Sequence, residues 1–136
     1  MSSFSGSLDA NIILRLLVRD VPDQYKASKK LLENAKGQFA VADTALIEVA
    51  FVLHRAYGLT KVQVREALEG FMMLSQINCN RIMFEKALEV YILAAGLSLE
   101  DCALTAYAQI NNALPLYTFD KQLAKHSTNA ELLTTI

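Results

Sequence analysis

Short apolar segments alternate with stretches that carry helix signals, and this alternation constrains the fold of the chain more than any other feature. Strands are expected over residues 38–42, 77–79, 114–118 and 132–133, with helical patterns between them. Strands that are joined through helices form parallel sheets with right-handed crossovers. The sequence therefore predicts an α/β fold with a central, mostly parallel, twisted sheet.

Helix boundaries follow from capping residues, prolines and glycines. Two capping-box matches, Thr60 with Gln63 and Ser98 with Asp101, predict helices over about 61–74 and 99–110. By the same reasoning, helices are expected over residues 22–35, 43–57, 80–95 and 120–125. No repeat or linker divides the sequence, so residues 1–136 are expected to form a single domain, with residues 1–6 as a flexible lead.

Composition limits the class of protein. Hydrophobic residues make up 53% of the 136 residues and charged residues 20%, which indicates a globular chain with one core. The N-terminal residues lack the basic start and apolar core of a secretory signal. The apolar run 12–18 contains Arg15 and is too short to span a membrane. Cys79 and Cys102 form no CxxC pair, so reduced thiols and a cytoplasmic location are expected, and a structural zinc site is not.

Glu48 is the only charged residue in the apolar run 45–53. A carboxylate buried among branched aliphatic side chains is costly unless a cation or an ion pair compensates it. The alternatives are a position at the edge of the apolar stripe, or a buried pair with Arg55 or Arg15. A bound metal ion and these ordinary explanations carry about equal weight on the residues alone.

Three aspartates, Asp9, Asp101 and Asp120, lie at expected junctions between a strand or loop and a helix. In a parallel α/β sheet such junctions lie at the carboxyl ends of strands, where sites form. Asp is also a favoured N-cap, and Asp101 fits the acidic position of the Ser98 capping box, so each aspartate taken singly is better explained as a cap.

Four acids in one cleft would repel one another, and divalent metal would relieve this repulsion. Mg²⁺ prefers oxygen ligands, and metal-bound water can attack phosphorus in phosphodiester hydrolysis. The net charge is −1, but without these four acids thirteen basic residues face ten acidic ones, a balance of +3 that is compatible with an RNA partner. No GxxxxGK or GxGxxG motif is present, which disfavours nucleoside triphosphates and dinucleotides.

Four segments in order along the chain resemble the motifs of the PIN-domain ribonucleases, especially VapC-type toxins. These segments are residues 8–15 (LDANIILR), the helix around Glu48 up to residue 59, residues 100–104 (EDCAL), and residues 116–121 (LYTFDK). The resemblance covers residues 7–133. Ala10 stands where the family usually has Thr, and the first strand is less apolar than usual.

The resemblance implies a three-layer α/β/α PIN-like fold and a metal-dependent endoribonuclease, the toxin of a VapBC-type toxin–antitoxin pair. It implies Mg²⁺ or Mn²⁺ bound by the four acids, an RNA substrate, a cognate antitoxin protein and a homodimer. The high apolar fraction of the sequence is compatible with a buried surface between protein partners. By the resemblance, the catalytic and metal-binding acids are Asp9, Glu48, Asp101 and Asp120. The supporting residues are Asn11, which would orient Asp9, and Thr118. The expected RNA-phosphate contacts are Arg15, Arg19, Lys121 and Lys125.

Three other functions remain open at this point. The chain is compatible with a PIN nuclease of RNA processing that is not a toxin, and with a catalytically silent PIN scaffold, which Ala10 makes conceivable. A phospho-acceptor switch domain also gathers acids and Mg²⁺ at strand ends, but its acids come paired and early, whereas Glu48 here lies inside an expected helix.

Overall fold

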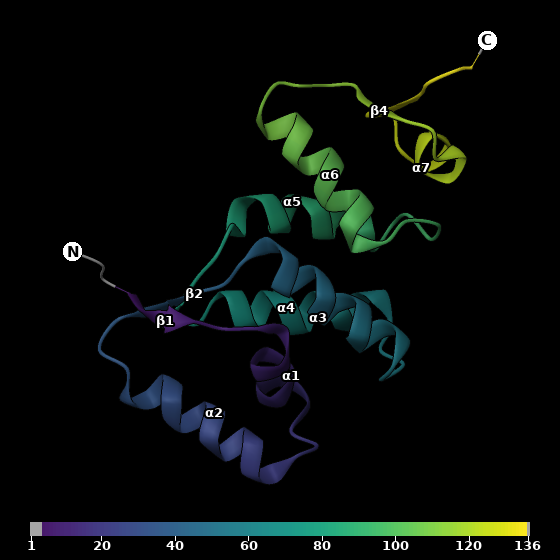
Figure 1. Cartoon of the computed structure of the whole chain (residues 1–136). Helices are drawn as coiled ribbons and strands as arrows, with labels where there is room; N and C mark the ends of the chain where they lie inside the picture. The colour runs from purple at the N-terminus through teal and green to yellow at the C-terminus, as the bar shows by residue number, and fades with distance from the viewer. Residues whose placement is uncertain (1–3, 136) are drawn as a thin grey trace. The chain divides into compact units, whose positions relative to one another are not determined.

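The computed structural model describes residues 4–135, whose contacts divide them into two compact units (Figure 1). The first unit ends at Arg81 and the second begins at Ile82. Each unit contains a parallel sheet and its own helices. That residues 1–136 form a single domain stays a prediction.

The first unit contains the three-stranded sheet β1-β2-β3. Its elements are β1 (Phe4–Ser7), α1 (Ala10–Val18), α2 (Pro22–Asn34), β2 (Gln38–Ala40), α3 (Asp43–Arg55), α4 (Lys61–Met72) and β3 (Ile77–Asn78). Both strand pairs are parallel. Helix α1 packs against α2 and α3, and α3 packs against α4.

Strand β1, which precedes Asp9, is irregular. Its register with β2 shifts between Phe4 and Gly6. Gly6 has a φ of 151°, which an L side chain rarely adopts, so this position requires glycine. Pairing then continues beyond the strand, because the Leu8 N–H donates to the Ala40 carbonyl at 3.1 Å. This bond fixes the chain just before Asp9, which is the N-cap of α1.

Helix α3 anchors the first unit through one apolar stripe. Leu46, Val49 and Leu53 recur at helical spacing and are almost fully buried, at 0%, 0% and 1% exposed. Ile13 and Leu14 of α1 are buried in the same unit. Because α1 and α3 pack against each other, the positions of the two helices relative to each other are fixed.

The second unit contains a two-stranded parallel sheet and three helices among the described residues. Its elements are α5 (Arg81–Tyr91), α6 (Leu99–Ile110), β4 (Leu116–Thr118), α7 (Lys121–His126) and β5 (Ala130–Leu132). Phe84, Leu88 and Cys102 are fully buried and form its core with Tyr91. Burial raises the pKa of the Tyr91 phenol, and the nearby Cys102 thiol adds to this effect.

The predicted PIN-like α/β fold with parallel strands is confirmed, and most predicted helices and strands are found within a few residues of their expected bounds. The described strands nevertheless form two sheets rather than one central sheet. Residues 4–6, expected in a flexible lead, belong to β1; residues 1–3 lie outside the described part of the chain.

Helix α5 ends at Tyr91, whereas the sequence predicted that it would continue to Ala95. The chain tightens after this point, because the Leu93 N–H donates to the carbonyl of Val90, three residues back. Gly96 was interpreted as a helix stop. In the structure a Cβ at this position would lie 2.9 Å from a ring carbon of His126, so glycine permits a close approach of the two chain segments.

No helix within residues 4–135 is long and apolar enough to cross a lipid bilayer. This finding agrees with the length of α1, which contains the apolar run 12–18 and is only nine residues long.

We expect Leu46→Ala to lower the free energy of unfolding by about 2–5 kcal/mol, because Leu46 is completely buried and its loss leaves a cavity. Phe51→Ala on the same helix is the matched control. Phe51 is 61% exposed, so its removal should change stability by no more than about 0.5 kcal/mol. Urea unfolding of both variants measures the difference, and similar losses in the two would contradict the assigned inner face of α3.

Candidate functional site

Asp9 lies at the junction of β1 and α1, where it is the N-cap of the helix. Its backbone is extended, with φ −88° and ψ 174°, and the Ile12 N–H donates to Asp9 Oδ1 at 3.0 Å. The side chain is exposed. Among the described residues Oδ2 accepts no hydrogen bond, so one carboxylate oxygen fixes the side chain and the other remains available to a ligand.

Glu48 is exposed on α3, which corrects the argument made from its apolar neighbours. Leu46 and Val49 face the core, whereas Glu48 lies on another face of the same helix. Within residues 4–135 Glu48 makes no ion pair, so the alternative of a buried pair with Arg55 or Arg15 is wrong. The alternative of a carboxylate outside the buried stripe agrees with its exposure. The argument that burial requires a compensating cation therefore does not apply to Glu48, and its role as a metal ligand stays a prediction.

Asp9 and Glu48 nevertheless line the same hollow, of about 560 Å³, in the first unit. Its wall includes the hydroxyl-bearing residues Ser7 and Thr44, together with backbone and apolar atoms of β1, α1 and α3. Sequence reasoning missed both hydroxyl residues. Thr44 could have been found from its spacing, because a residue four positions before Glu48 lies on the same face of the helix.

A second hollow, of about 660 Å³, borders Asp9 on the side of α1 and α2. Asn11, Arg15 and Gln24 line it. The resemblance implied a hydrogen bond that lets Asn11 orient Asp9. Among the described residues Asn11 makes no such bond, and the Ile12 backbone N–H holds Asp9 instead.

Asp120 is the N-cap of α7 in the second unit. Its Oδ1 accepts from the Gln122 N–H at 2.9 Å and the Leu123 N–H at 3.1 Å. The Asp120 N–H donates to Thr118 Oγ1 at 2.9 Å, so the Thr118 hydroxyl holds the backbone of the aspartate. That Thr118 supports a catalytic site stays a prediction. The carboxylate is exposed.

Asp101 belongs to the capping box at the start of α6. The Ser98 N–H donates to Asp101 Oδ2 at 3.2 Å, and the Asp101 N–H donates to Ser98 Oγ at the same distance. The residue is half-buried. All three aspartates therefore take part in capping a helix, Asp9 and Asp120 as N-caps and Asp101 as the acid of a capping box. Each of them leaves one carboxylate oxygen outside the capping bonds.

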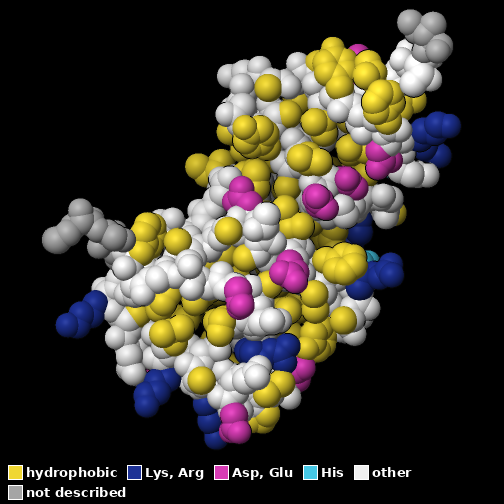
Figure 2. All heavy atoms as spheres, viewed as in Figure 1, with side chains coloured by type: hydrophobic (Ala, Val, Ile, Leu, Met, Phe, Trp, Pro, Cys, Tyr) yellow, Lys and Arg dark blue, Asp and Glu magenta, His cyan; other side chains and the backbone are white. Residues whose placement is uncertain are grey.

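The predicted RNA-binding residues differ in the contacts that their side chains make with the rest of the protein. Arg15 is paired with Asp20 at 2.8 Å, and the Arg19 guanidinium lies 4.8 Å from the centre of the Tyr25 ring. Lys121 and Lys125 are exposed on α7. On the face of the described residues seen in Figure 2, lysine and arginine side chains are dispersed among apolar and acidic ones. Attraction to RNA would therefore depend on individual contacts.

Carboxylate oxygens are suitable ligands for Mg²⁺ or Mn²⁺, and such a site commonly uses one or two carboxylates plus substrate phosphate. Asp9 and Glu48 on one hollow meet that requirement. Across residues 4–135 no group of three or more His, Cys, Asp or Glu side chains is assembled closely enough to hold a metal ion. That Asp101 and Asp120 join the pair stays a prediction.

A comparison with models of protein families assigns the chain to a family. The model of the PIN domain family matches residues 7–129, a range that includes all four predicted acids. The chain belongs to the PIN domain family. PIN domains are generally nucleases and typically use divalent metals. A comparison with curated proteins found no match to the chain.

Substitutions at Asp9 should separate its role as a cap from any role as a ligand. We expect Asp9→Ala to lower the free energy of unfolding by about 1 kcal/mol, because the Ile12 N–H loses its acceptor. Asp9→Asn keeps an acceptor oxygen, so its stability should remain within about 0.5 kcal/mol of wild type. Thermal and urea unfolding measure both, and an equal loss in the two variants would contradict the cap.

Proposed function

We propose that this chain is a metal-dependent endoribonuclease, the toxin of a VapBC-type pair, which cleaves RNA phosphodiester bonds with a metal-activated water. The observation that carries the proposal is the shared hollow of Asp9 and Glu48. These acids come from separate elements of a chain in a family of nucleases. A toxin of this kind would act on RNA in the cytoplasm.

Asp9 and Glu48 would hold Mg²⁺ or Mn²⁺, and Asp101 and Asp120 would complete the site directly or through water. A cation held there would supply a nucleophilic water and would neutralise charge on the phosphate. No side-chain nucleophile is then required. The Ser7 and Thr44 side chains beside the acids offer hydroxyl groups to waters or to substrate oxygens.

The protein contributes a fixed arrangement of these acids. Asp9 is held by its cap bond to Ile12, and Glu48 projects from a helix whose opposite stripe is completely buried. Groups that are already in place when substrate arrives avoid the entropic cost of ordering them during the reaction. The exposure of both carboxylates leaves them accessible to a polyanion as large as RNA.

We expect the wild-type chain to cleave single-stranded or structured RNA with Mg²⁺ or Mn²⁺ and to lose this activity in chelator. Asp9→Asn and Glu48→Gln should each lower the cleavage rate by at least about 10-fold, because losing a metal ligand should cost no less than losing the partner that orients one. Gel analysis of labelled RNA measures the rates. Activity that survives chelator, or survives both substitutions, would rule out the proposed mechanism.

Asp43→Asn is the matched control for these variants. Asp43 is also an exposed acid of α3, in its first turn, but it does not line the hollow of Asp9 and Glu48. Its substitution removes the same charge and should leave cleavage within about twofold of wild type. If wild type itself cleaves no RNA with either metal, the chain acts as a PIN scaffold rather than a nuclease.

An antitoxin would have a suitable surface in the first unit. A groove of about 460 Å³ has walls formed by α1, α2 and α4, and its apolar side chains include Leu16, Leu32 and Leu74. Apolar grooves of this kind accept the apolar face of an amphipathic helix. In the second unit, Leu104, Tyr107 and Ile110 are exposed at three-residue spacing on α6, a strip that a second copy would cover in a homodimer.

The groove proposal predicts a variant that escapes inhibition. Leu74 is 42% exposed at the groove, so Leu74→Glu should leave the fold intact and place a charge where an apolar helix would bind. Co-expression with the product of a short reading frame immediately upstream should silence the wild-type nuclease but not this variant. Equal silencing of both would exclude the groove, and cleavage that no upstream product silences would favour an RNA-processing nuclease.

A further inference from the structure

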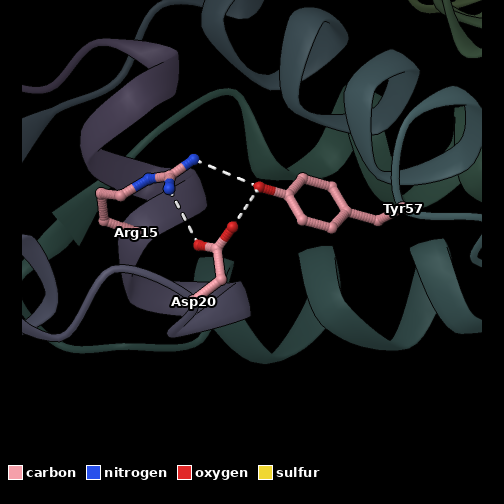
Figure 3. Close-up of polar contacts among 3 residues, drawn as sticks. All are labelled: Arg15, Asp20 and Tyr57. Atoms are coloured by element: carbon pink, nitrogen blue, oxygen red, sulfur yellow. Dashed lines mark hydrogen bonds and ion pairs between the residues drawn. The ribbon is translucent and has the colours of Figure 1, made fainter.

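Arg15 is held in a closed network by two residues that lie outside α1 (Figure 3). Its Nη1 donates to Asp20 Oδ1 at 2.8 Å, and its Nη2 donates to the Tyr57 hydroxyl at 3.3 Å. The Tyr57 hydroxyl in turn donates to Asp20 Oδ2 at 2.7 Å. One carboxylate thus accepts from both partners, and the guanidinium has a fixed position.

This network leaves much of the guanidinium unused. An arginine side chain has five N–H donors in a rigid fork, and within residues 4–135 the bonds to Asp20 and Tyr57 use two of them. The Arg15 side chain is only 16% exposed, and it lines the hollow of about 660 Å³ that also borders Asp9. A positioned, mostly desolvated guanidinium with free donors is suited to bind a phosphate.

The other walls of this hollow suit a nucleotide rather than a bare anion. Ile12, Val21 and Ala27 supply apolar surface. Asn11 and Gln24 supply side-chain amides, each of which carries both donors and an acceptor, as the edge of a nucleobase does. The volume falls in the range that is typical of small-ligand sites.

We propose that this hollow is a subsite for one nucleotide of the RNA next to the scissile bond, with Arg15 binding its phosphate. Asp20 and Tyr57 are positioning residues that orient Arg15. The inference rests on the proposed nuclease function, because Asp9 borders both this hollow and the one it shares with Glu48. A strand of RNA that passes Asp9 would then enter the space between α1 and α2.

The simpler alternative is that the network only ties α1 to the end of α3. Such a role would affect stability, and it would leave RNA affinity and its salt dependence unchanged in a folded variant. Binding at several salt concentrations therefore separates the two roles.

The first experiment measures binding of a short single-stranded RNA of mixed sequence in chelator, where cleavage cannot intervene. We expect Arg15→Gln to weaken binding about tenfold and to reduce the slope of log affinity against log salt by about 0.7, the contribution of one phosphate contact on a single strand. Arg65→Gln is the matched control, because Arg65 is also ion-paired, with Glu69 at 3.1 Å, but lies on α4 outside the hollow. It should bind within about twofold of wild type.

Two conservative variants test the positioning without removing charge. Tyr57→Phe keeps the ring and loses only the hydroxyl, so it should raise KM for RNA cleavage several-fold while kcat and the salt slope stay unchanged. Arg15→Lys keeps the charge and loses the fork, so it should retain the salt slope but bind more weakly than wild type. A Tyr57→Phe variant that is less stable but has an unchanged KM would overturn the positioning role.

The outcomes for the subsite and for the nuclease can be told apart. If Arg15→Gln binds RNA with the wild-type affinity and slope while wild type cleaves RNA, the subsite is wrong and the nuclease stands. If Arg15 controls the salt slope but no metal supports cleavage, the subsite stands and the nuclease is wrong. If wild type binds no RNA in chelator, the subsite is overturned whatever the cleavage assay shows.

Discussion

The bond between the Ile12 N–H and the Asp9 carboxylate is the interaction on which the candidate site depends. It marks the start of α1 after β1 and fixes Asp9, which borders both hollows described above. Without it, the first turn of α1 would leave a backbone donor unsatisfied and the carboxylate would be free to rotate. Glu48, Asn11 and Arg15 line the hollows beside Asp9, and they can act together with its carboxylate only if that carboxylate keeps a fixed position.

Capping and metal binding are compatible uses of the same residue. A capping bond needs one side-chain oxygen, and aspartate has two. Asp9 and Asp120 as N-caps, and Asp101 as the acid of the Ser98 capping box, can therefore each support the start of a helix and still present a carboxylate oxygen. The partial positive charge at a helix N-terminus also favours an anionic side chain. The ordinary explanation of these aspartates is therefore correct, and it supports the functional one by explaining how the acids are held in place.

The sequence predicted the elements well because their signals are local. The capping boxes of Thr60 and Ser98 and the cap at Asp120 are found where residue type and spacing indicated them. Glu48 was misjudged because its neighbours in sequence are apolar, whereas burial in a helix depends on the face. The division of the strands into two sheets depends on contacts between distant segments, for which no local pattern gives a signal. The hollows and the network of Arg15, Asp20 and Tyr57 could not be predicted for the same reason, because they too depend on contacts between distant segments.

That network also explains how an arginine can lie near a carboxylate of the site without pairing with it. Asp20 is the ion-pair partner of Arg15, and within residues 4–135 Asp9 makes no ion pair. If Arg15 were paired with Asp9, the guanidinium would compete with a cation for that carboxylate. Because Asp20 and Tyr57 hold the guanidinium from elsewhere, a negative carboxylate and a positive guanidinium can border one hollow as separate binding groups. A substrate that carries phosphates and recruits a metal ion requires both.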